Sequence, residues 1–380
     1  MSKKLMYSII GGVVVIALIS TLLIMGKKKA PQAPVVPVEP VVEVPVEPVE
    51  IVEEVIEPEF QKGVSYVAWT KEGYSNSNSV KAMEQMAAQG IEWVCLVVTR
   101  FQDKFDSTNI YSFKDKTPSD ESLIFAIKKL HDLGLKVMIK PHLDLLESEG
   151  KWRGEIGFGD MDSWETWFAS YADFVLYYAE LAEKENVEIF CIGTELSSAT
   201  LSQPRLWSDL ISKIRNVYKG ALTYAANWHD EFANIEFWDE LDYAGVDAYF
   251  PLISSSNPNK EELMQVWQDW LGMIEDWQSQ IDKPILITEI GYKSSVGATD
   301  EPWQHAPLGE IDLKLQADCY AALLETFWDK PWFYGVYWWY YGVNPKMGGQ
   351  FHRGFTPQNK PAQEVITEWY SNKEILEKAY

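Results

Sequence analysis

Residues 187–196, VEIFCIGTEL, and residues 283–292, KPILITEIGY, share one pattern, in which a short apolar run ends in a glutamate. Six further short runs are rich in β-branched and aromatic residues. They lie at 63–69, 91–98, 135–141, 221–226, 241–249 and 333–339. Nearly continuous apolar runs of this length are typical of strands that are buried on both faces of a parallel sheet.

Between these runs lie stretches whose apolar residues recur at helical spacing. Helices are predicted at 77–89, 119–133, 163–183, 204–218, 261–280, 313–328 and 361–370, with a weaker one at 230–240. The second of them opens with Ser119 or Asp120 as a cap and stops at Gly134. Eight strand–helix units within residues 60–380 predict an α/β fold, a closed (β/α)8 TIM barrel. An open doubly wound sheet is the alternative, but no G-x-G-x-x-G motif follows the first run.

The chain before residue 60 has a different composition. Residues 7–25 carry no charge over 19 positions, and lysines flank them on both sides. As a helix, such a stretch roughly spans the ~30 Å hydrocarbon layer of a bilayer. We find no convincing A-x-A cleavage site and no lipobox cysteine, so residues 1–29 are expected to be an uncleaved single-pass anchor. A cleaved signal peptide is the alternative.

Residues 30–59 are rich in proline, valine and glutamate and contain no basic residue. Proline at this spacing opposes helix and central strand, and the like charges repel one another. We therefore expect an extended linker between the anchor and a single catalytic domain at 60–380.

Composition narrows the classes of function. The chain has 33 basic and 56 acidic residues, a formal net charge of −23, which argues against nucleic acid as a partner. Three scattered cysteines and five histidines without an H-x-x-x-H pair indicate no disulfide scaffold, metal or cofactor. The 17 Trp and 19 Tyr suit a core, but they also suit a cleft that stacks flat sugar rings.

Two carboxylates fall where the chemistry of a TIM barrel is found, at the carboxyl ends of strands. Glu195 ends the fourth predicted strand and Glu289 ends the seventh, so the two should face each other across the barrel mouth. Facing carboxyls are the pair that glycoside hydrolysis needs, one as proton donor and one as nucleophile. The structural alternative is that each glutamate caps a loop or pairs with an arginine.

Beyond this pair, motifs along nearly the whole of 60–380 resemble one family. They are GVSYVAW (63–69), KVMIKPHLD (136–144), CIGTELSS (191–198), YAANW (224–228), DYAGVDAYFPL (242–252), ITEIGY (287–292) and GVYWWYY (335–341). The domain resembles glycoside hydrolase clan A, and most closely family 113, whose known members are endo-β-1,4-mannanases. The resemblance implies a retaining double displacement, with Glu195 as acid/base and Glu289 as nucleophile.

The resemblance also implies roles for neighbouring residues. Tyr249 would hydrogen-bond the nucleophile, and Trp339, or Trp338 if the strand parity differs, would form the floor of the sugar site. Arg100 would clamp the nucleophile, as clan arginines do. The chain departs from the clan at Thr194, where an asparagine usually contacts the substrate 2-hydroxyl. Asn227, after the fifth strand, is a candidate to replace that contact.

Further candidates come from their positions alone, and packing is an equal alternative for each. His142 follows the third strand and could bond a sugar hydroxyl. Trp69 and Trp228 lie at strand ends and could stack on sugar rings. Trp152 and Trp303 lie in loops and could form outer subsites.

These observations predict a monomeric, membrane-tethered endo-β-mannanase that acts on neutral polysaccharide or oligosaccharide. Because polymers do not enter the cytoplasm, the barrel is expected outside it, in the periplasm or at the cell surface. Two alternatives stay open: another clan-A β-glycosidase acting on β-glucan, xylan or a small β-glycoside, and a non-catalytic carbohydrate-binding barrel. The loops at 99–118, 144–162 and 293–311 decide whether the cleft is open at both ends.

Overall fold

A computed structural model describes residues 58–252, 258–306 and 309–371. The predicted membrane anchor, and the predicted linker as far as residue 57, lie outside these residues. Among the helices in the described ranges, none has the combination of length and apolar character that crossing a bilayer requires.

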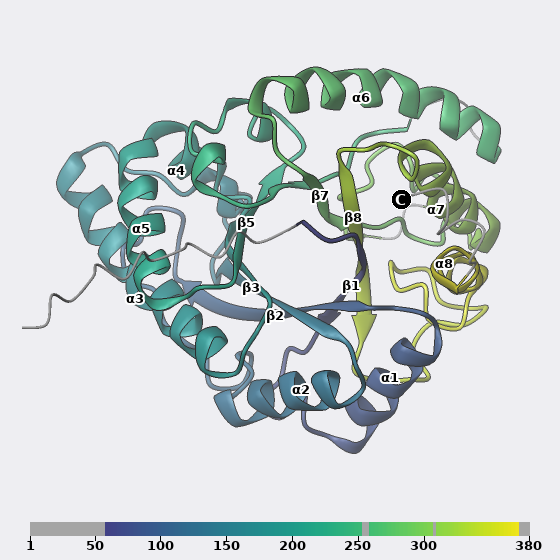
Figure 1. Ribbon diagram of the computed structural model, residues 1–380, viewed down its shortest axis with the longest axis horizontal. Helices are drawn as coiled ribbons and strands as arrows, with labels where there is room; N and C mark the ends of the chain where they lie inside the picture. The colour runs from purple at the N-terminus through teal and green to yellow at the C-terminus, as the bar shows by residue number, and fades with distance from the viewer. Residues whose placement is uncertain (1–57, 253–257, 307–308, 372–380) are drawn as a thin grey trace, which may run out of the picture. The chain divides into compact units, whose positions relative to one another are not determined.

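The centre of the fold is a ring of eight parallel strands that pair in chain order and close between β8 and β1 (Figure 1). The strands are β1 (Gln61–Val67), β2 (Trp93–Gln102), β3 (Lys136–Leu145), β4 (Ile189–Thr194), β5 (Ala221–Asn227), β6 (Ala244–Asp247), β7 (Ile285–Ile290) and β8 (Phe333–Gly342). The predicted closed parallel barrel is confirmed. Each of the eight apolar runs became a strand, because each could be buried on both faces.

Helices surround the ring on its outer side (Figure 1). They are α1 (Ser77–Ala88), α2 (Asp120–Asp132), α3 (Met161–Lys184), α4 (Ser197–Ser202), α5 (Pro204–Val217), α6 (Lys260–Ile281), α7 (Leu313–Phe327) and α8 (Pro361–Ser371). As predicted, Ser119 caps α2, and its side chain accepts a hydrogen bond from the backbone N–H of Ser122. The short helix α4, directly after β4, was not predicted.

The predicted helix at 230–240 is wrong. This segment forms two single 3₁₀ turns, η2 (Phe232–Asn234) and η3 (Trp238–Glu240). Its large apolar residues, Phe232 and Trp238 among them, are buried, and the indole of Trp238 donates a hydrogen bond to the carbonyl of Phe232 at 2.9 Å. The segment therefore packs as an irregular loop with two 3₁₀ turns and not as one amphipathic helix.

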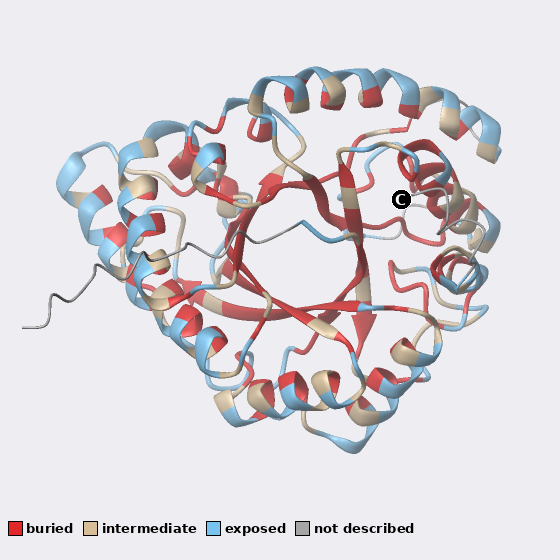
Figure 2. Cartoon of the chain, in the orientation of Figure 1, coloured by how far each residue is buried: buried red, intermediate tan, exposed pale blue. Residues whose placement is uncertain are grey.

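The two largest hydrophobic clusters of the described residues are separated by the barrel wall. Side chains inside the ring form a compact layer, whose members are Trp93, Cys95, Met138, Ile189, Cys191, Ala221, Ala225, Tyr243, Leu286 and Tyr337. A larger cluster fills the space between the strands and the helices, and Figure 2 shows the helices buried toward the ring and exposed away from it. Because side chains alternate along a strand, this division fixes which residues can reach the barrel mouth.

Candidate active site

The two predicted carboxylates both lie at the carboxyl ends of their strands. Glu289 is in β7 and Glu195 directly follows β4. Their side chains are largely buried, with exposed fractions of 11% and 18%. The two carboxyls interact electrostatically, because the negative charge of Glu289 helps to raise the pKa of Glu195. The same charge helps to raise the pKa of Arg153, which lies beside Glu195.

Glu289 is held by a donor on each carboxylate oxygen. The ammonium of Lys140 donates to Oε2 at 2.7 Å, and the hydroxyl of Tyr249 donates to Oε1 at 2.7 Å. The predicted contact between Tyr249 and Glu289 is therefore present. Burial, and next the Glu289 carboxylate, raise the pKa of Tyr249 well above its ordinary value, so this group stays a hydroxyl donor.

Lys140 is a site residue that the sequence analysis missed. It projects inward from β3 and is completely buried, with Nζ 3.9 Å from the carboxylate of Asp247. Burial opposes its charged form, but the carboxylates of Asp247 and Glu289 outweigh burial and raise the pKa of Lys140. Lys140 is therefore a fixed positive charge against Glu289. Its inward position follows from strand alternation, because Met138, two residues earlier, belongs to the inner layer.

The predicted clamp by Arg100 is wrong. Its guanidinium lies 5.0 Å from the ring centre of Phe174 and 5.3 Å from that of Tyr177, both on α3 outside the ring. On β2 the odd-numbered residues Trp93 and Cys95 face inward, so an even-numbered residue faces the helices. Lys140 from the neighbouring strand takes the place that was expected for Arg100.

Glu195 has a different environment. Its Oε1 accepts a hydrogen bond from the side-chain amide of Asn227 at 2.8 Å, and its Oε2 lies 3.8 Å from Nη1 of Arg153. Burial raises the pKa of Glu195; Arg153 opposes this increase, and the negative charge of Glu289 adds to it. A carboxyl of this kind is suited to keep a proton and to donate it.

Asn227 thus reaches the carboxyl that the resemblance assigns to acid/base catalysis. Thr194, which stands where the clan usually has asparagine, turns its hydroxyl to the backbone carbonyl of Pro141 at 3.4 Å. Whether Asn227 also contacts the substrate stays a prediction.

Arg153, also missed, belongs to the 3₁₀ turn η1 (Arg153–Glu155) in the loop after β3. Its Nη2 pairs with the carboxylate of Asp144 at 2.5 Å, and its Nη1 lies 3.5 Å from Nδ1 of His142. Burial, Arg153 and Lys140 hold the pKa of His142 well below its ordinary value, so the imidazole is neutral. A contact of His142 with a sugar hydroxyl stays a prediction.

The ambiguity between the adjacent tryptophans of β8 is resolved. Trp338 faces the helices, where it stacks on Tyr320 at 3.9 Å between ring centres and donates a hydrogen bond to Tyr370. Trp339 faces the barrel mouth, clusters with Tyr249 and lies parallel to His142 at 6.0 Å. Trp339 is therefore the one of the two that can meet a substrate at the mouth.

A cleft of about 1020 Å³ opens beside Glu195. Its lining includes Glu195, Asn227, Arg153 and three tryptophans, Trp152, Trp228 and Trp303. Trp228 and Trp303 stack on each other at 5.2 Å. Trp69 does not line this cleft; it is 48% exposed and packs edge-on against Tyr340.

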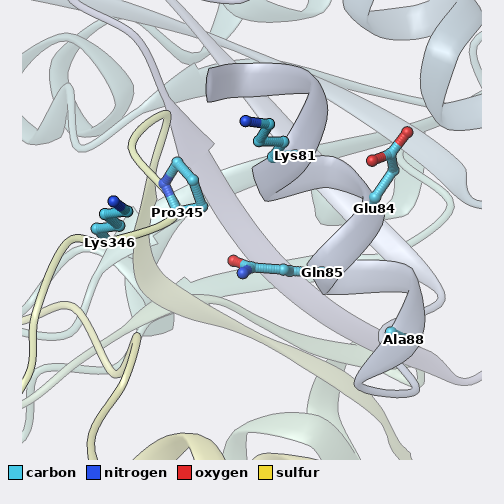
Figure 3. A pocket seen from close by; sticks show the side chains of 6 residues that line it. All are labelled: Lys81, Glu84, Gln85, Ala88, Pro345 and Lys346. Carbon is cyan, nitrogen blue, oxygen red and sulfur yellow. The ribbon is translucent and has the colours of Figure 1, made fainter. Parts of the chain in front are cut away.

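A second hollow, of about 400 Å³, lies on the outside of the barrel (Figure 3). It is lined by α1 and by Pro345 and Lys346 of the segment after β8. It brings no pair of carboxylates together, and its acidic residue, Glu84, pairs with Lys129 at 3.1 Å. Within the described ranges, no group of histidine, cysteine and acidic side chains is placed to hold a metal ion.

Several solved structures of β-mannanases are similar to this chain over most of its length. Two structures of a GH113 β-1,4-mannanase are 29% identical to this chain, cover 83% of it and 99% of their own length, and have TM-scores of 0.74 and 0.75. The GH113 β-mannanase of Alicyclobacillus acidocaldarius, solved with ManMIm, is 28% identical, covers 82% of this chain and 97% of its own, and has a TM-score of 0.74. A β-glucuronidase of Faecalibacterium prausnitzii, 13% identical with a TM-score of 0.54 over 83% of this chain and 49% of its own, shows only the shared fold.

Among curated proteins, the alkanal monooxygenase beta chain of Photobacterium leiognathi is 25% identical over 128 residues. That match spans 32% of this chain and 36% of the monooxygenase, too little to assign a family. The Glycoside Hydrolase Family 113 model, in contrast, matches residues 64–360, from within β1 to the residue before α8. The chain therefore belongs to Glycoside Hydrolase Family 113 and is a glycoside hydrolase.

Proposed function

We propose that this hydrolase cleaves β-1,4-linked mannan-type polysaccharide or oligosaccharide by a retaining double displacement. The observation that carries the proposal is the contrast between the two carboxyls. Glu195 has a raised pKa, while Glu289 is bound by an ammonium and a hydroxyl donor that suit an ionised carboxylate. Such a contrast separates an acid from a nucleophile.

In the first step, the Glu289 carboxylate attacks the anomeric carbon, and the bond to the leaving oxygen breaks. Glu195 donates its proton to that oxygen, so the leaving sugar departs as a neutral alcohol. In the second step, Glu195, now ionised, removes a proton from water, and this water displaces Glu289 from the anomeric carbon. The product has the anomeric configuration of the substrate, and both glutamates return to their starting states.

The surrounding residues support these steps. Lys140 and Tyr249 fix the orientation of the attacking carboxylate, because each binds one of its two oxygens. Trp339 offers a flat aromatic face at the mouth for the sugar that is attacked. Asn227 holds the Glu195 carboxyl toward the leaving oxygen.

The cleft favours a polymeric substrate. Glu195, the proposed proton donor, lines this cleft, so we assign the cleft to the sugars of the leaving group. The cleft is also lined by Trp152, Trp228 and Trp303, whose aromatic surfaces suit successive sugar rings. The related solved structures are β-mannanases, which is why we propose a mannan-type chain as the substrate.

A substrate panel tests the proposal. The purified full-length protein is incubated with mannan, glucomannan, cellulose and xylan, and the products are sized. We expect mannan and glucomannan to be shortened to oligosaccharides, with cellulose and xylan cleaved far more slowly. Proton NMR of the first products from mannan should show the β-anomer before mutarotation. First products in the α-configuration would exclude the double displacement, and preference for xylan or cellulose would exclude the mannan assignment.

We also propose that the catalytic domain lies outside the cytoplasm, held by the predicted anchor at 7–25. The support is the uncharged stretch itself together with the proposed polymeric substrate. An alkaline phosphatase fused after residue 60 should be active in cells, because this enzyme folds to an active form only outside the cytoplasm. The matched control is the same fusion without residues 1–29, which should be inactive. An inactive full fusion that is expressed at normal level would contradict this location.

A further inference from the structure

We propose that Glu231 is a positioning residue for Glu195, fixing both the backbone that carries this glutamate and the amide that holds its carboxyl. The inference rests on the proposed role of Glu195 as acid/base. Glu231 lies in the segment between β5 and η2 and is completely buried. It accepts a hydrogen bond from Thr200 of α4, and its partner Tyr224 belongs to the cluster between the strands and the helices.

The backbone of Glu195 needs such support. Its φ is +51°, in the left-handed region that residues with a Cβ adopt at a cost. Strained conformations of this kind persist at functional sites only where the surroundings enforce them. Two hydrogen bonds do so here: Glu195 N–H donates to the carbonyl of Ala225 at 2.8 Å, and the next N–H, of Leu196, donates to the Tyr224 hydroxyl at 2.7 Å.

The second of these contacts leads to Glu231, which holds the Tyr224 hydroxyl. Oε1 of Glu231 accepts hydrogen bonds from the hydroxyls of Tyr224 at 2.7 Å and Thr200 at 2.8 Å. Its Oε2 accepts from the backbone N–H of Asn227 at 2.7 Å and from the hydroxyl of Ser197 at 3.0 Å. Four donors thus meet one carboxylate.

The four donors form two groups, and both groups restrain Glu195. Tyr224, Ser197 and Thr200 fix Leu196, the residue directly after Glu195, and the helix α4 that follows it. The remaining donor, Asn227 N–H, fixes the residue whose side chain bonds Glu195 Oε1 at 2.8 Å. One buried carboxylate therefore restrains Glu195 from its backbone and from its carboxyl.

Packing alone does not explain a glutamate at this position. A carboxyl is costly to bury, and burial raises the pKa of Glu231 to about 7 even with its four donors opposing the increase. An apolar residue would avoid that cost only if the four donors were apolar or turned elsewhere as well. A group with four acceptor sites is useful where several donors must be held in one arrangement.

The test compares Glu231→Gln with wild type on two substrates. Gln has nearly the same shape but accepts hydrogen bonds at only one end, so at least one pair of donors loses its acceptor. For mannan oligosaccharides, which have poor leaving groups, we expect kcat/KM to fall roughly 10- to 100-fold, part of the 10²–10⁴-fold that a general acid contributes. For an aryl β-mannoside with an activated leaving group, which needs little protonation, kcat/KM should change less than about threefold.

Two further variants separate positioning from a general loss of stability. Tyr224→Phe removes the link to Leu196 and should show the same selectivity with a smaller loss, which keeps the test open if Glu231→Gln folds poorly. Glu188→Gln is the matched control. Glu188 lies just before the opposite end of β4, where it accepts a hydrogen bond from Val137 N–H at 2.8 Å. This control should lower the melting temperature without changing the ratio of kcat/KM on mannan oligosaccharides to kcat/KM on the aryl β-mannoside.

Equal losses on both substrates, or no loss on the oligosaccharides, would overturn the role of Glu231. The same substrates applied to Glu195→Gln distinguish this failure from failure of the proposed function. If Glu195→Gln shows the selectivity and Glu231→Gln does not, only the present inference falls. If Glu195→Gln shows none, the assignment of the acid/base falls.

Discussion

Replacing Glu289 with alanine should reduce kcat on mannan by on the order of 10⁴- to 10⁶-fold, the scale seen when a covalent nucleophile is removed. Sodium azide should restore part of the turnover and yield a glycosyl azide. The structure explains why: alanine leaves space below the anomeric carbon, and Lys140, which is fully buried and charged, loses its 2.7 Å contact with Glu289. A small anion is attracted to that position. Glu195 is still present to protonate the leaving group.

The stereochemistry of the rescued product makes the experiment decisive. Azide attacks from the face that Glu289 occupied, so a β-linked substrate should give an α-glycosyl azide, identified by NMR and mass spectrometry. Glu165→Ala, on an exposed position of α3, is the control and should keep full activity. A folded Glu289→Ala protein that gives no azide product, or that turns over like wild type, would contradict the nucleophile assignment.

The fold was predictable because the signal is repeated. Every strand is a short apolar run, and a helix or turn separates each run from the next. Eight such units in a row leave few alternatives to a closed barrel. The exception is 230–240. It contains as many large buried side chains as a helix would need, but these side chains do not all lie on one face of a helix. Its hydrogen bonds, such as that from Trp238 to the Phe232 carbonyl, depend on packing that a sequence pattern does not contain.

The site was predictable where a residue directly follows or ends a strand. Glu195, Glu289 and Asn227 are of this kind, and they lie at the carboxyl ends of β4, β7 and β5. Trp339 lies inside β8, and strand alternation turns it toward Tyr249 at the mouth. Arg100 fails for the same reason that the others succeed, because a shift of one position along a strand turns a side chain to the opposite face. Its aromatic partners on α3 confirm the outward orientation.

Lys140 and Arg153 show two further limits. Lys140 lies inside an apolar run, KVMIKP, where a lysine is most simply interpreted as reaching out to solvent. Only the ring closure brings Glu289 and Asp247 within 4 Å of its ammonium and offsets its burial. Arg153 comes from a loop turn, and its 3.8 Å approach to Glu195 depends on loop geometry that periodicity does not determine.

Glu195→Gln should separate the two chemical steps. On mannan oligosaccharides, kcat/KM should fall about 10²- to 10⁴-fold, because the leaving oxygen departs without its proton donor. On an aryl β-mannoside with an activated leaving group, kcat/KM should stay close to wild type, since glycosylation no longer needs the proton. Its kcat should fall, however, because water attacks the covalent intermediate without a base, and the glycosyl-enzyme should accumulate and be detectable by intact-protein mass spectrometry.

The pH profile gives an independent check on the same residue. Glu195 must be protonated for glycosylation, so in the wild type kcat/KM on oligosaccharides should fall as pH rises through the pKa of Glu195. Burial raises this pKa, so the fall should occur at higher pH than for an ordinary glutamate. Glutamine does not titrate, so this limb should disappear in Glu195→Gln. If both substrates slow equally, or if the limb persists unchanged, a different residue supplies the proton, and the contrast between the two strand-end carboxyls does not have the catalytic meaning proposed for it.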